Sequence, residues 1–361
     1  MPTPTRPGQN IPRRRRRKKK RLRFLIFNAL IFSLIIGISA VGYASWRIDQ
    51  AFDEMVIPST EKVQVSKSAG AVKTVQAEAE QEEEKDTFSV LILGRDYRPE
   101  TGTNLTDVMI VATIDKKNGK ASMASIPRDT KVYFPEIDHR AKANEAFNLG
   151  EHLRKQEEAE GKQPTVDGSM LAKQMAEDVF DIPIDRFVVV DFESFKAIVD
   201  AVGGITVDVE RDMIYNDPND GTHINLRAGR QHLNGQNALN WVRHRKDDRG
   251  ENFYSSDFDR NRRQKEAIKA IASELTSFKG ATKLFDVMDA MADHIRTDLS
   301  KDELKSLFLS LRNFSLDGIQ TLETPNVYWD SAELQTVIPK EDRQLIHEEL
   351  QDVLEGKEKP E

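Results

Sequence analysis

The chain has 361 residues, enough for one large domain or two ordinary ones. Its 38% hydrophobic and 31% charged residues, with 19 glycines and 14 prolines, exclude collagen-like, mucin-like and wholly disordered chains. The absence of cysteine excludes disulfide scaffolds, cysteine zinc sites, iron–sulfur clusters and thiol nucleophiles. Charge is unevenly divided: residues 1–23 carry eleven basic residues and no acidic one, whereas the rest carries 42 basic and 60 acidic residues.

An uncharged apolar segment follows the basic run. Residues 24–45 span roughly 33 Å as a helix, about the thickness of one hydrocarbon core. Because Lys and Arg stay on the cytoplasmic side, we expect residues 1–23 to be a cytoplasmic tail in contact with anionic membrane lipid. Residues 24–46 are then a transmembrane helix, and the rest lies outside a cell membrane that the protein crosses once, in type II orientation. A cleavable signal peptide is the alternative for the apolar segment, and a nucleic-acid arm is the alternative for the basic run.

Residues 47–86 are expected to form an extracytoplasmic stalk, because their acidic composition cannot bury a core. The globular domain is predicted over residues 87–355. Strands are predicted, from short apolar and β-branched runs, at 88–93, 107–115, 120–126, 187–192, 205–209 and 319–322. Helices are predicted, from longer amphipathic runs and their capping residues, at 171–180, 193–202, from Asn234 to 241, and at 260–278, 283–294, 301–311 and 340–354.

The strands and helices alternate along the chain, but Asn118-Gly119 predicts a tight hairpin between the second and third strands. An alternating chain favours parallel strands, whereas a hairpin makes neighbours antiparallel. We therefore predict an α/β domain in which a mixed β-sheet is covered by helices.

Carboxylates flank the turn between the first two predicted strands. Asp96 ends the first strand and Asp107 opens the second, so together they could hold one hard cation through oxygen ligands. Capping and turn roles are the alternative for each. Arg128 ends the third strand and is expected at the same sheet edge as Asp96. The alternative is an ordinary surface Arg–Asp pair, which contributes little to stability.

The densest polar segment covers residues 241–264. Arg243 and Arg245 lie two positions apart, and Arg260 and Arg263 lie three apart on one face of the following helix. Arginine forks match phosphate oxygens, so two elements could clamp a pyrophosphate, with Asp257 as a base or metal ligand. A surface charge cluster is the alternative, whereas nucleic acid is not expected as a partner because the domain is strongly acidic.

His244, between the two arginines, could be a general base, and the alternative is a residue that is merely packed or exposed. The chain has no Gly-X-Ser-X-Gly, Walker, HEXXH or Gly-rich nucleotide motif.

Taken in order, several of these segments resemble the LytR–CpsA–Psr family of Gram-positive envelope enzymes. The resemblance rests on LILGRD (91–96), TDVMIVATI (106–114), SIPRDT (125–130), KANEAFNLG (142–150), IPIDRFVVVDFESFKAIVDAVGGITVDV (182–209), GRQHLNGQNALNWVRHRKDD (229–248), DFDRNRRQ (257–264) and TDLS (297–300). It implies a transferase that attaches an anionic glycopolymer, teichoic acid- or capsule-like and carried on polyprenyl pyrophosphate, to peptidoglycan. The reaction is a phosphotransfer that leaves polyprenyl phosphate in the membrane.

The resemblance also implies roles for particular residues. Asp96 and Asp107 would hold Mg²⁺ or Mn²⁺ on the pyrophosphate, and Asp257 would activate the acceptor hydroxyl. The pyrophosphate oxygens would be bound by Arg128, Lys142, Arg243, Arg245, Arg260 and Arg263, of which Arg243, Arg245 and Arg260 are also counted as catalytic. An apolar pocket between sheet and helices, with residues 193–202 as one wall, would hold the lipid tail.

The chain departs from the family pattern at two positions. Leu105 stands where an arginine is common, and Asp259 stands where a glycine is usual. Two other functions fit the same residues: a non-catalytic scaffold that binds polyprenyl lipid, and a hydrolase of the lipid pyrophosphate.

Overall fold

The computed structural model describes residues 85–98, 103–218, 221–276, 295–315 and 317–357. All of them belong to the second of two compact units, Ala51–Glu361. The predicted tail, transmembrane helix and almost all of the stalk lie outside the described residues, as does the helix expected at 283–294, so these stay predictions. None of the helices in the described ranges is both long and apolar enough to cross a membrane.

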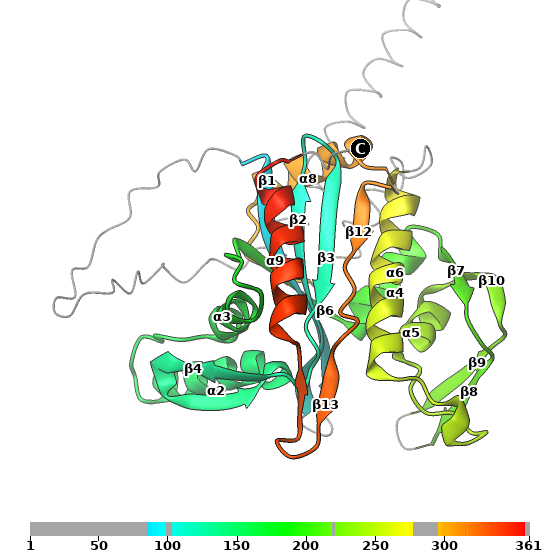
Figure 1. Ribbon diagram of the computed structural model, residues 1–361, viewed down its shortest axis with the longest axis horizontal. Coiled ribbons are helices and arrows are strands. Elements are labelled where there is room, and N and C mark those ends of the chain that lie inside the picture. Colours follow the sequence, from blue (N-terminus) through cyan, green and yellow to red (C-terminus); the bar gives the residue numbers. More distant parts are fainter. Residues whose placement is uncertain (1–84, 99–102, 219–220, 277–294, 316, 358–361) are drawn as a thin grey trace, which may run out of the picture. The chain divides into compact units, whose positions relative to one another are not determined.

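A six-stranded sheet forms the centre of the described domain (Figure 1). In spatial order its strands are β11 (Arg296–Thr297), β6 (Arg186–Asp191), β1 (Thr87–Arg98), β2 (Thr103–Asp115), β3 (Lys120–Ser125) and β12 (Ile319–Thr321). The β1–β6 and β3–β12 pairs are parallel and the other pairs are antiparallel. The predicted mixed sheet is thereby confirmed, and so is the hairpin, because Asp115 pairs with Lys120 across the Asn118-Gly119 turn.

Helices cover the sheet and the outlying hairpins. They are α2 (Ala146–Ala159), α3 (Gly168–Phe180), α4 (Phe192–Ala201), α5 (Gly235–Arg243), α6 (Asp257–Thr276), α8 (Lys301–Ser310) and α9 (Lys340–Leu354), with 3-10 turns η1 (Pro135–Ile137), η2 (Ala143–Glu145), η3 (Glu251–Phe253) and η4 (Leu311–Asn313). Two-stranded ladders join β4 (Lys131–Phe134) to β5 (His139–Lys142), β7 (Ile205–Val209) to β10 (Gly229–Leu233), β8 (Met213–Asp217) to β9 (Thr222–Leu226), and β13 (Tyr328–Asp330) to β14 (Gln335–Val337).

One face of the sheet packs against α3 and α9. Alternate residues of a strand point to the same face, so Leu91, Met109 and Ala124 together form part of one buried cluster. Ile346 and Leu350 of α9 belong to the same cluster, and Figure 1 shows α9 lying across β2 and β3. This is the larger core of the domain.

The other face of the sheet packs against α6. Val90, Ile110 and Met123 form its buried part, while Ile268 and Ala272 of α6 are only partly buried against it. A third cluster joins α4, α5 and α6 to the β7–β10 and β8–β9 ladders around Trp241, which is fully buried. Helix α6 therefore belongs to two cores, which its residues from Ala267 onward join.

Most predicted elements agree with the structure. Asn234 caps α5 as expected, since its side chain accepts a hydrogen bond from the Asn237 backbone at 3.0 Å. Helix α6 begins three residues earlier than predicted, at Asp257. Helix α2 and the β4–β5, β8–β9 and β13–β14 ladders were not predicted, because α2 is mostly polar and the strands of these ladders are only three to five residues long and interrupted by polar residues.

Candidate active site

Arg128 joins three elements at one edge of the sheet. It lies in the turn after β3, with Nη1 3.4 Å from Asp107 Oδ1 of β2 and Nε 3.9 Å from Asp257 Oδ2 of α6. Asp129 Oδ2 is 3.4 Å from the same Nε. Burial alone would lower the pKa of Arg128, but the negative charges of Asp257, Asp107 and Asp129 outweigh it and raise that pKa. Arg128 is therefore a permanent cation among carboxylates.

Asp257 is the first residue of α6 and forms an ion pair with Arg260, one turn later. Burial raises the pKa of Asp257, but the charges of Arg260, Arg128 and Arg245 outweigh it, so that pKa lies below its usual range. A helix N-terminus also favours a negative charge. Asp257 is therefore ionised, and while both arginines hold it, it is a poor proton acceptor.

Lys142 reaches the same cluster from another direction. It ends β5, and its Nζ lies 2.7 Å from Asp129 Oδ1. Its ammonium also lies 5.9 Å from the centre of the exposed Trp329 ring of β13. Asp129 thus holds both Lys142 and Arg128, a role that the sequence did not reveal. The sequence signal for this role of Asp129 is that it directly follows Arg128 at the end of a strand.

A β-bulge sets the position of Asp107. Gly94 pairs with Val108 and Arg95 with Thr106, so Asp107 is the extra residue of β2 and has no partner in β1. The side chain of a bulged residue does not follow the regular alternation between the two faces of the sheet. The Asp107 carboxylate forms an ion pair with Arg128. The backbone of Asp96 pairs with Leu105 two positions further along the ladder. The two aspartates predicted to bind metal thus come from paired strands at one end of the sheet.

Arg243 and Arg245 flank the end of α5. The Arg243 guanidinium lies 4.3 Å from the centre of the Phe192 ring, which orients it by a cation–π contact. Arg245 is exposed and close enough for its charge to lower the pKa of Asp257, after the larger effects of Arg260 and Arg128. Arg245 is therefore brought to the Asp257 cluster.

Arg263 has a different environment. Its side chain is fully buried, and it donates to the backbone carbonyls of Trp241 at 2.5 Å, His244 at 2.8 Å and Asp259 at 3.1 Å. Burial lowers the pKa of Arg263 to about 10. The prediction that Arg263 binds pyrophosphate directly does not agree with this arrangement. Two arginines on the same face of a helix need not bind the same group. Arg263 instead holds the end of α5 against α6.

His244 is packed, which settles the alternative left open by the sequence. It is fully buried, with Nδ1 2.9 Å from Ser255 Oγ and Nε2 3.3 Å from Asp247 Oδ2. Burial and the nearby charge of Arg263 lower the pKa of His244. Asp247 in turn accepts hydrogen bonds from Arg249 and from the Ile214 backbone. This buried network holds the loop between α5 and α6, which carries Arg245.

The described residues contain no group of three or more His, Cys, Asp or Glu side chains arranged to hold a metal ion by themselves. Two buried guanidinium nitrogens of the cluster, Nε of Arg128 and Nε of Arg260, make no hydrogen bond to any described residue. Buried donors of this kind are rare and usually point to a missing ligand or water. The cluster therefore has unused hydrogen-bonding capacity for an anion.

Comparison with known proteins identifies a family and several relatives. The model of the LytR_cpsA_psr family matches residues 55–352. TagV of Bacillus subtilis (strain 168), named polyisoprenyl-teichoic acid–peptidoglycan teichoic acid transferase, is 30% identical over 304 residues, covering 83% of this chain and 69% of TagV. TagU of the same strain, named as the same kind of transferase, is 31% identical over 293 residues, covering 81% of this chain and 83% of TagU.

Solved structures are similar in fold as well. The crystal structure of B. subtilis TagV matches with a TM-score of 0.59 and 28% identity, covering 75% of this chain and 98% of that one. A structure of TagT bound to LIIa-WTA matches with a TM-score of 0.55 and 26% identity, covering 75% of this chain and 92% of that one. Since the family model matches well over half of its residues, the chain belongs to the LytR_cpsA_psr family.

Proposed function

We propose that this protein is an extracytoplasmic phosphotransferase that moves an anionic, teichoic acid- or capsule-like glycopolymer from polyprenyl pyrophosphate to peptidoglycan. Relatives at 30% and 31% identity are named for teichoic acid transfer. The observation that carries the proposal is the convergence of Arg128, Arg260 and Lys142 from three elements, with two buried donors unused. Phosphoryl transfer needs positioning and charge neutralisation of this kind more than covalent chemistry.

The reaction forms one P–O bond and breaks another. A sugar hydroxyl of peptidoglycan attacks the polymer-side phosphorus, polyprenyl phosphate leaves, and the hydroxyl proton passes to Asp257. In the free protein Asp257 pairs with Arg128 and Arg260. A bound pyrophosphate competes for both guanidinium groups, so their hold on Asp257 weakens and its proton affinity rises. Substrate binding would thus convert Asp257 from an ion-pair partner into a base.

A divalent cation, Mg²⁺ or Mn²⁺, is part of the proposal. Its donors would be Asp96 and Asp107, whose backbones lie close on paired strands, with further ligands from pyrophosphate. Carboxylate oxygens suit a hard cation. Two carboxylates do not complete the coordination of such an ion, so they suit a metal ion that is also bound by the pyrophosphate. When bound, the ion would neutralise charge on the phosphate oxygens. Arg128 would then exchange its contact with Asp107 for one with phosphate.

The lipid tail is assigned to the α6 face of the sheet. Partly buried apolar side chains line this face, from Ile92 and Val108 on the strands to Ile268 and Ala272 on α6. Phe195 of α4 is partly buried nearby in the adjoining cluster. A prenyl chain there would remove this apolar surface from water. Residues 193–202, predicted as one wall, fall within α4 except for Val202, which caps its end.

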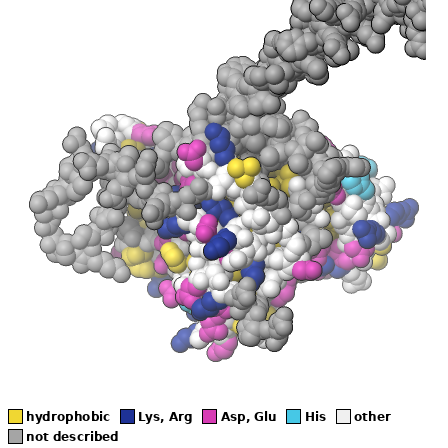
Figure 2. Space-filling view, turned by 90° about the horizontal axis from the view of Figure 1, so that it is seen from above, with side chains coloured by type: hydrophobic (Ala, Val, Ile, Leu, Met, Phe, Trp, Pro, Cys, Tyr) yellow, Lys and Arg dark blue, Asp and Glu magenta, His cyan; other side chains and the backbone are white. Residues whose placement is uncertain are grey.

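Membrane attachment through residues 24–46, with residues 1–23 inside, completes the proposal. A reporter fused after Glu361 should be active only outside the cytoplasm, and activity inside would contradict this topology. Nucleic acid is not a proposed partner: basic and acidic side chains lie interspersed on the face in Figure 2.

Transfer by the full-length protein in lipid vesicles would test the function. The substrates would be a synthetic polyprenyl-pyrophosphate glycan and a soluble peptidoglycan oligosaccharide. We expect a phosphodiester-linked product and free polyprenyl phosphate, both dependent on Mg²⁺. Release of free glycan phosphate without coupling would instead identify a hydrolase. Binding of the lipid without turnover would identify a scaffold.

A further inference from the structure

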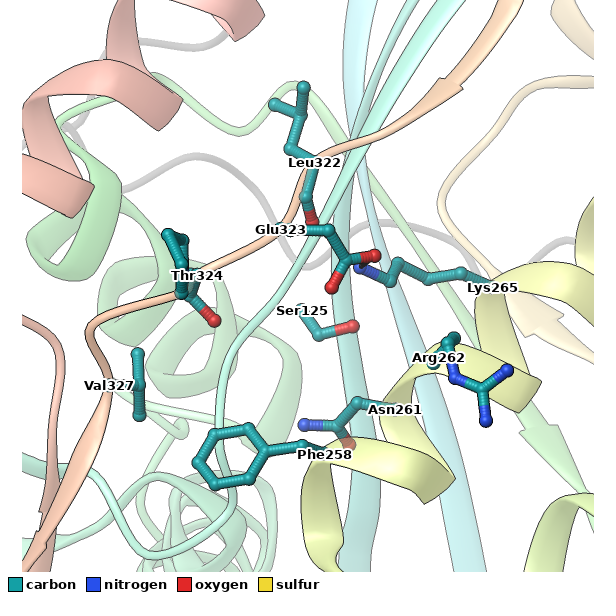
Figure 3. A pocket seen from close by; sticks show the side chains of 10 residues that line it. Ser125, Phe258, Asn261, Arg262, Lys265, Leu322, Glu323, Thr324 and Val327 are labelled. Carbon is teal, nitrogen blue, oxygen red and sulfur yellow. Dashed lines mark hydrogen bonds and ion pairs between the residues drawn. The ribbon is translucent and has the colours of Figure 1, made fainter.

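A small pocket lies beside Asp257, between α6 and the chain that leads from β12 to β13 (Figure 3). Its volume is about 260 Å³. The residues that matter for its chemistry are Ser125, Phe258, Asn261, Lys265 and Glu323. Phe258 and Asn261 belong to the same first turns of α6 as Asp257, and Ser125 ends β3 three residues before Arg128. The pocket therefore adjoins the proposed reaction centre without containing its arginines.

The side-chain hydroxyl of Ser125 has no hydrogen-bond partner among the residues that the structure describes. Ser125 is 8% exposed as a residue, and its Oγ is buried. Figure 3 shows the hydroxyl directed into the space bordered by Asn261 and Lys265. A buried hydroxyl without a hydrogen bond is unfavourable. A polar ligand in the pocket would supply its partner.

Lys265 and Glu323 make the pocket polar but close to neutral. Lys265 is a buried residue, only 4% exposed. Its ammonium group donates to the Leu322 carbonyl at 2.7 Å and to Glu323 Oε1 at 3.2 Å. An ammonium group has three donors, so one remains for a ligand. Glu323 balances the charge of Lys265. Arg262, which also lines the pocket, pairs with Glu210 at 3.4 Å and with Glu266 at 3.3 Å. The pocket therefore favours a neutral polar ligand over a second phosphate.

Asn261 and Phe258 indicate which class of ligand the pocket could bind. Asn261, half-buried on the pocket wall, offers both a donor and an acceptor in its amide. Phe258 presents a ring that is 47% exposed at the rim. A hydroxyl, an amide and a paired ammonium beside an aromatic ring suit a ring-shaped ligand with many hydroxyls. Sites for drug-sized ligands occupy roughly 300–1,000 Å³, so this smaller space suits one sugar ring rather than a lipid or a polymer.

The geometry points to a sugar-binding subsite formed by Ser125, Asn261, Lys265 and Phe258, which holds one pyranose ring of the peptidoglycan acceptor beside Asp257. This inference rests on the proposed function, because it assigns the acceptor of that same reaction. The acceptor is favoured over the first sugar of the donor because the pocket adjoins Asp257 and not Lys142 or the bulge at Asp107. A ring held there lies within a helical turn of the carboxylate that takes its proton.

Direct binding tests the subsite independently of catalysis. The probe is a soluble oligosaccharide of alternating N-acetylglucosamine and N-acetylmuramic acid, titrated into the full-length protein in detergent. Ser125→Ala and Asn261→Ala should each weaken binding about three- to tenfold, the loss of one neutral hydrogen bond. Ser122→Ala is the matched control, since it removes a buried hydroxyl on the same strand from the opposite face, and it should leave affinity unchanged. Ser125→Ala should not lower the melting temperature, because its hydroxyl has no partner to lose.

Two further measurements separate the outcomes. In transfer assays, the same variants should raise KM for the oligosaccharide and leave KM for the lipid donor unchanged. Unchanged oligosaccharide affinity in both variants, or no binding by the parent protein, would overturn the subsite. If the variants weaken binding of glycosylated polyprenyl pyrophosphate but not of the bare lipid, the pocket belongs to the donor sugar and the acceptor assignment is wrong. Pocket-dependent oligosaccharide binding without any transfer would contradict the proposed function alone, whereas transfer with an unchanged acceptor KM would contradict the subsite alone.

Discussion

Nε of Arg128, in the turn after β3, lies 3.9 Å from Oδ2 of Asp257, the first residue of α6. The two residues are far apart in sequence, and each also has a second partner, Asp107 for Arg128 and Arg260 for Asp257. Cations and carboxylates therefore alternate from β2 to α6. An incoming pyrophosphate would replace carboxylates as the partner of the arginines, and this exchange underlies the first two predictions.

Replacing Arg128 by lysine should reduce transfer by about tenfold or more, since a charge-assisted hydrogen bond contributes roughly 1.5–3 kcal/mol. Lysine keeps the charge but loses the planar fork that can bind two oxygens of one carboxylate or phosphate at once. Transfer rate and donor affinity should be measured together with the melting temperature. Arg154→Lys is the control and should leave transfer unchanged, because among the described residues Arg154 forms ion pairs with Glu151 and Glu158 of its own helix. Equal rates for both variants would argue against the site.

Arg245→Lys and Arg263→Lys should have opposite signatures. Arg245 is exposed, so its replacement should lower transfer with little change in melting temperature. Arg263 donates to three backbone carbonyls, two of them in buried hydrogen bonds, so its replacement should destabilise the fold by about 3 kcal/mol or more, the loss of two charge-assisted hydrogen bonds. Thermal unfolding of the two variants side by side checks the distinction. A stable Arg263→Lys protein with impaired donor binding would restore the direct role first predicted for Arg263.

The metal proposal predicts an effect on donor binding as well as on turnover. Mg²⁺ should tighten the affinity for polyprenyl pyrophosphate, and Asp107→Asn should remove that effect while the protein stays folded. The expected loss of transfer is about tenfold or more, comparable to one charge-assisted contact. Donor affinity measured with Mg²⁺ and with chelator, in the parent and the variant, checks this. A donor affinity that is the same in both conditions for the parent protein would exclude the metal role.

Gly94 should tolerate alanine only if Val108 is made smaller. A Cβ at Gly94 would lie 2.6 Å from the Cβ of Val108, at the point where the bulge displaces Asp107. Gly94→Ala should therefore cost about 1–3 kcal/mol by overpacking and lower transfer by moving Asp107. The double variant Gly94→Ala, Val108→Gly, which removes the Cβ of Val108 together with its methyl groups, should recover much of both. Melting temperature and transfer in the three proteins give the test, and an additive loss in the double variant would contradict this account.

His244 should make stability depend on pH. Burial, with the charge of Arg263, lowers the folded-state pKa of His244 below its ordinary value of about 6.5. Between the folded and unfolded pKa values the unfolded chain binds more protons, so stability rises with pH. The contribution of His244 is fully present above the unfolded value and is lost as the pH falls below it. Unfolding free energies from about pH 5 to 7.5 should show a flatter slope for His244→Gln than for the parent. The same slope in both proteins would assign the dependence to other groups.

The sequence by itself determined the fold class and the set of charged residues. Short apolar and β-branched runs predicted the strands β1, β2, β3 and β6, because a strand that is buried on both faces is apolar at consecutive positions. The Asn118-Gly119 turn predicted the antiparallel pairing of β2 with β3, and the Asn234 cap predicted the start of α5. These signals are local, so they can be found without knowing what packs where.

Only the tertiary structure decided which charged residues share a target. Arg260 and Arg263 have the same chemistry and lie on one helix, yet one pairs with Asp257 and the other is buried against the end of α5. Asp107 meets Arg128 because a bulge moves it out of the strand register, and Ser125 matters because its hydroxyl faces a pocket without a partner. Spacing along the chain places a side chain on a face of its own element, whereas its partners depend on how that element packs against segments far away in sequence. Desolvation and long-range contacts are therefore what separated a binding arginine from a structural one.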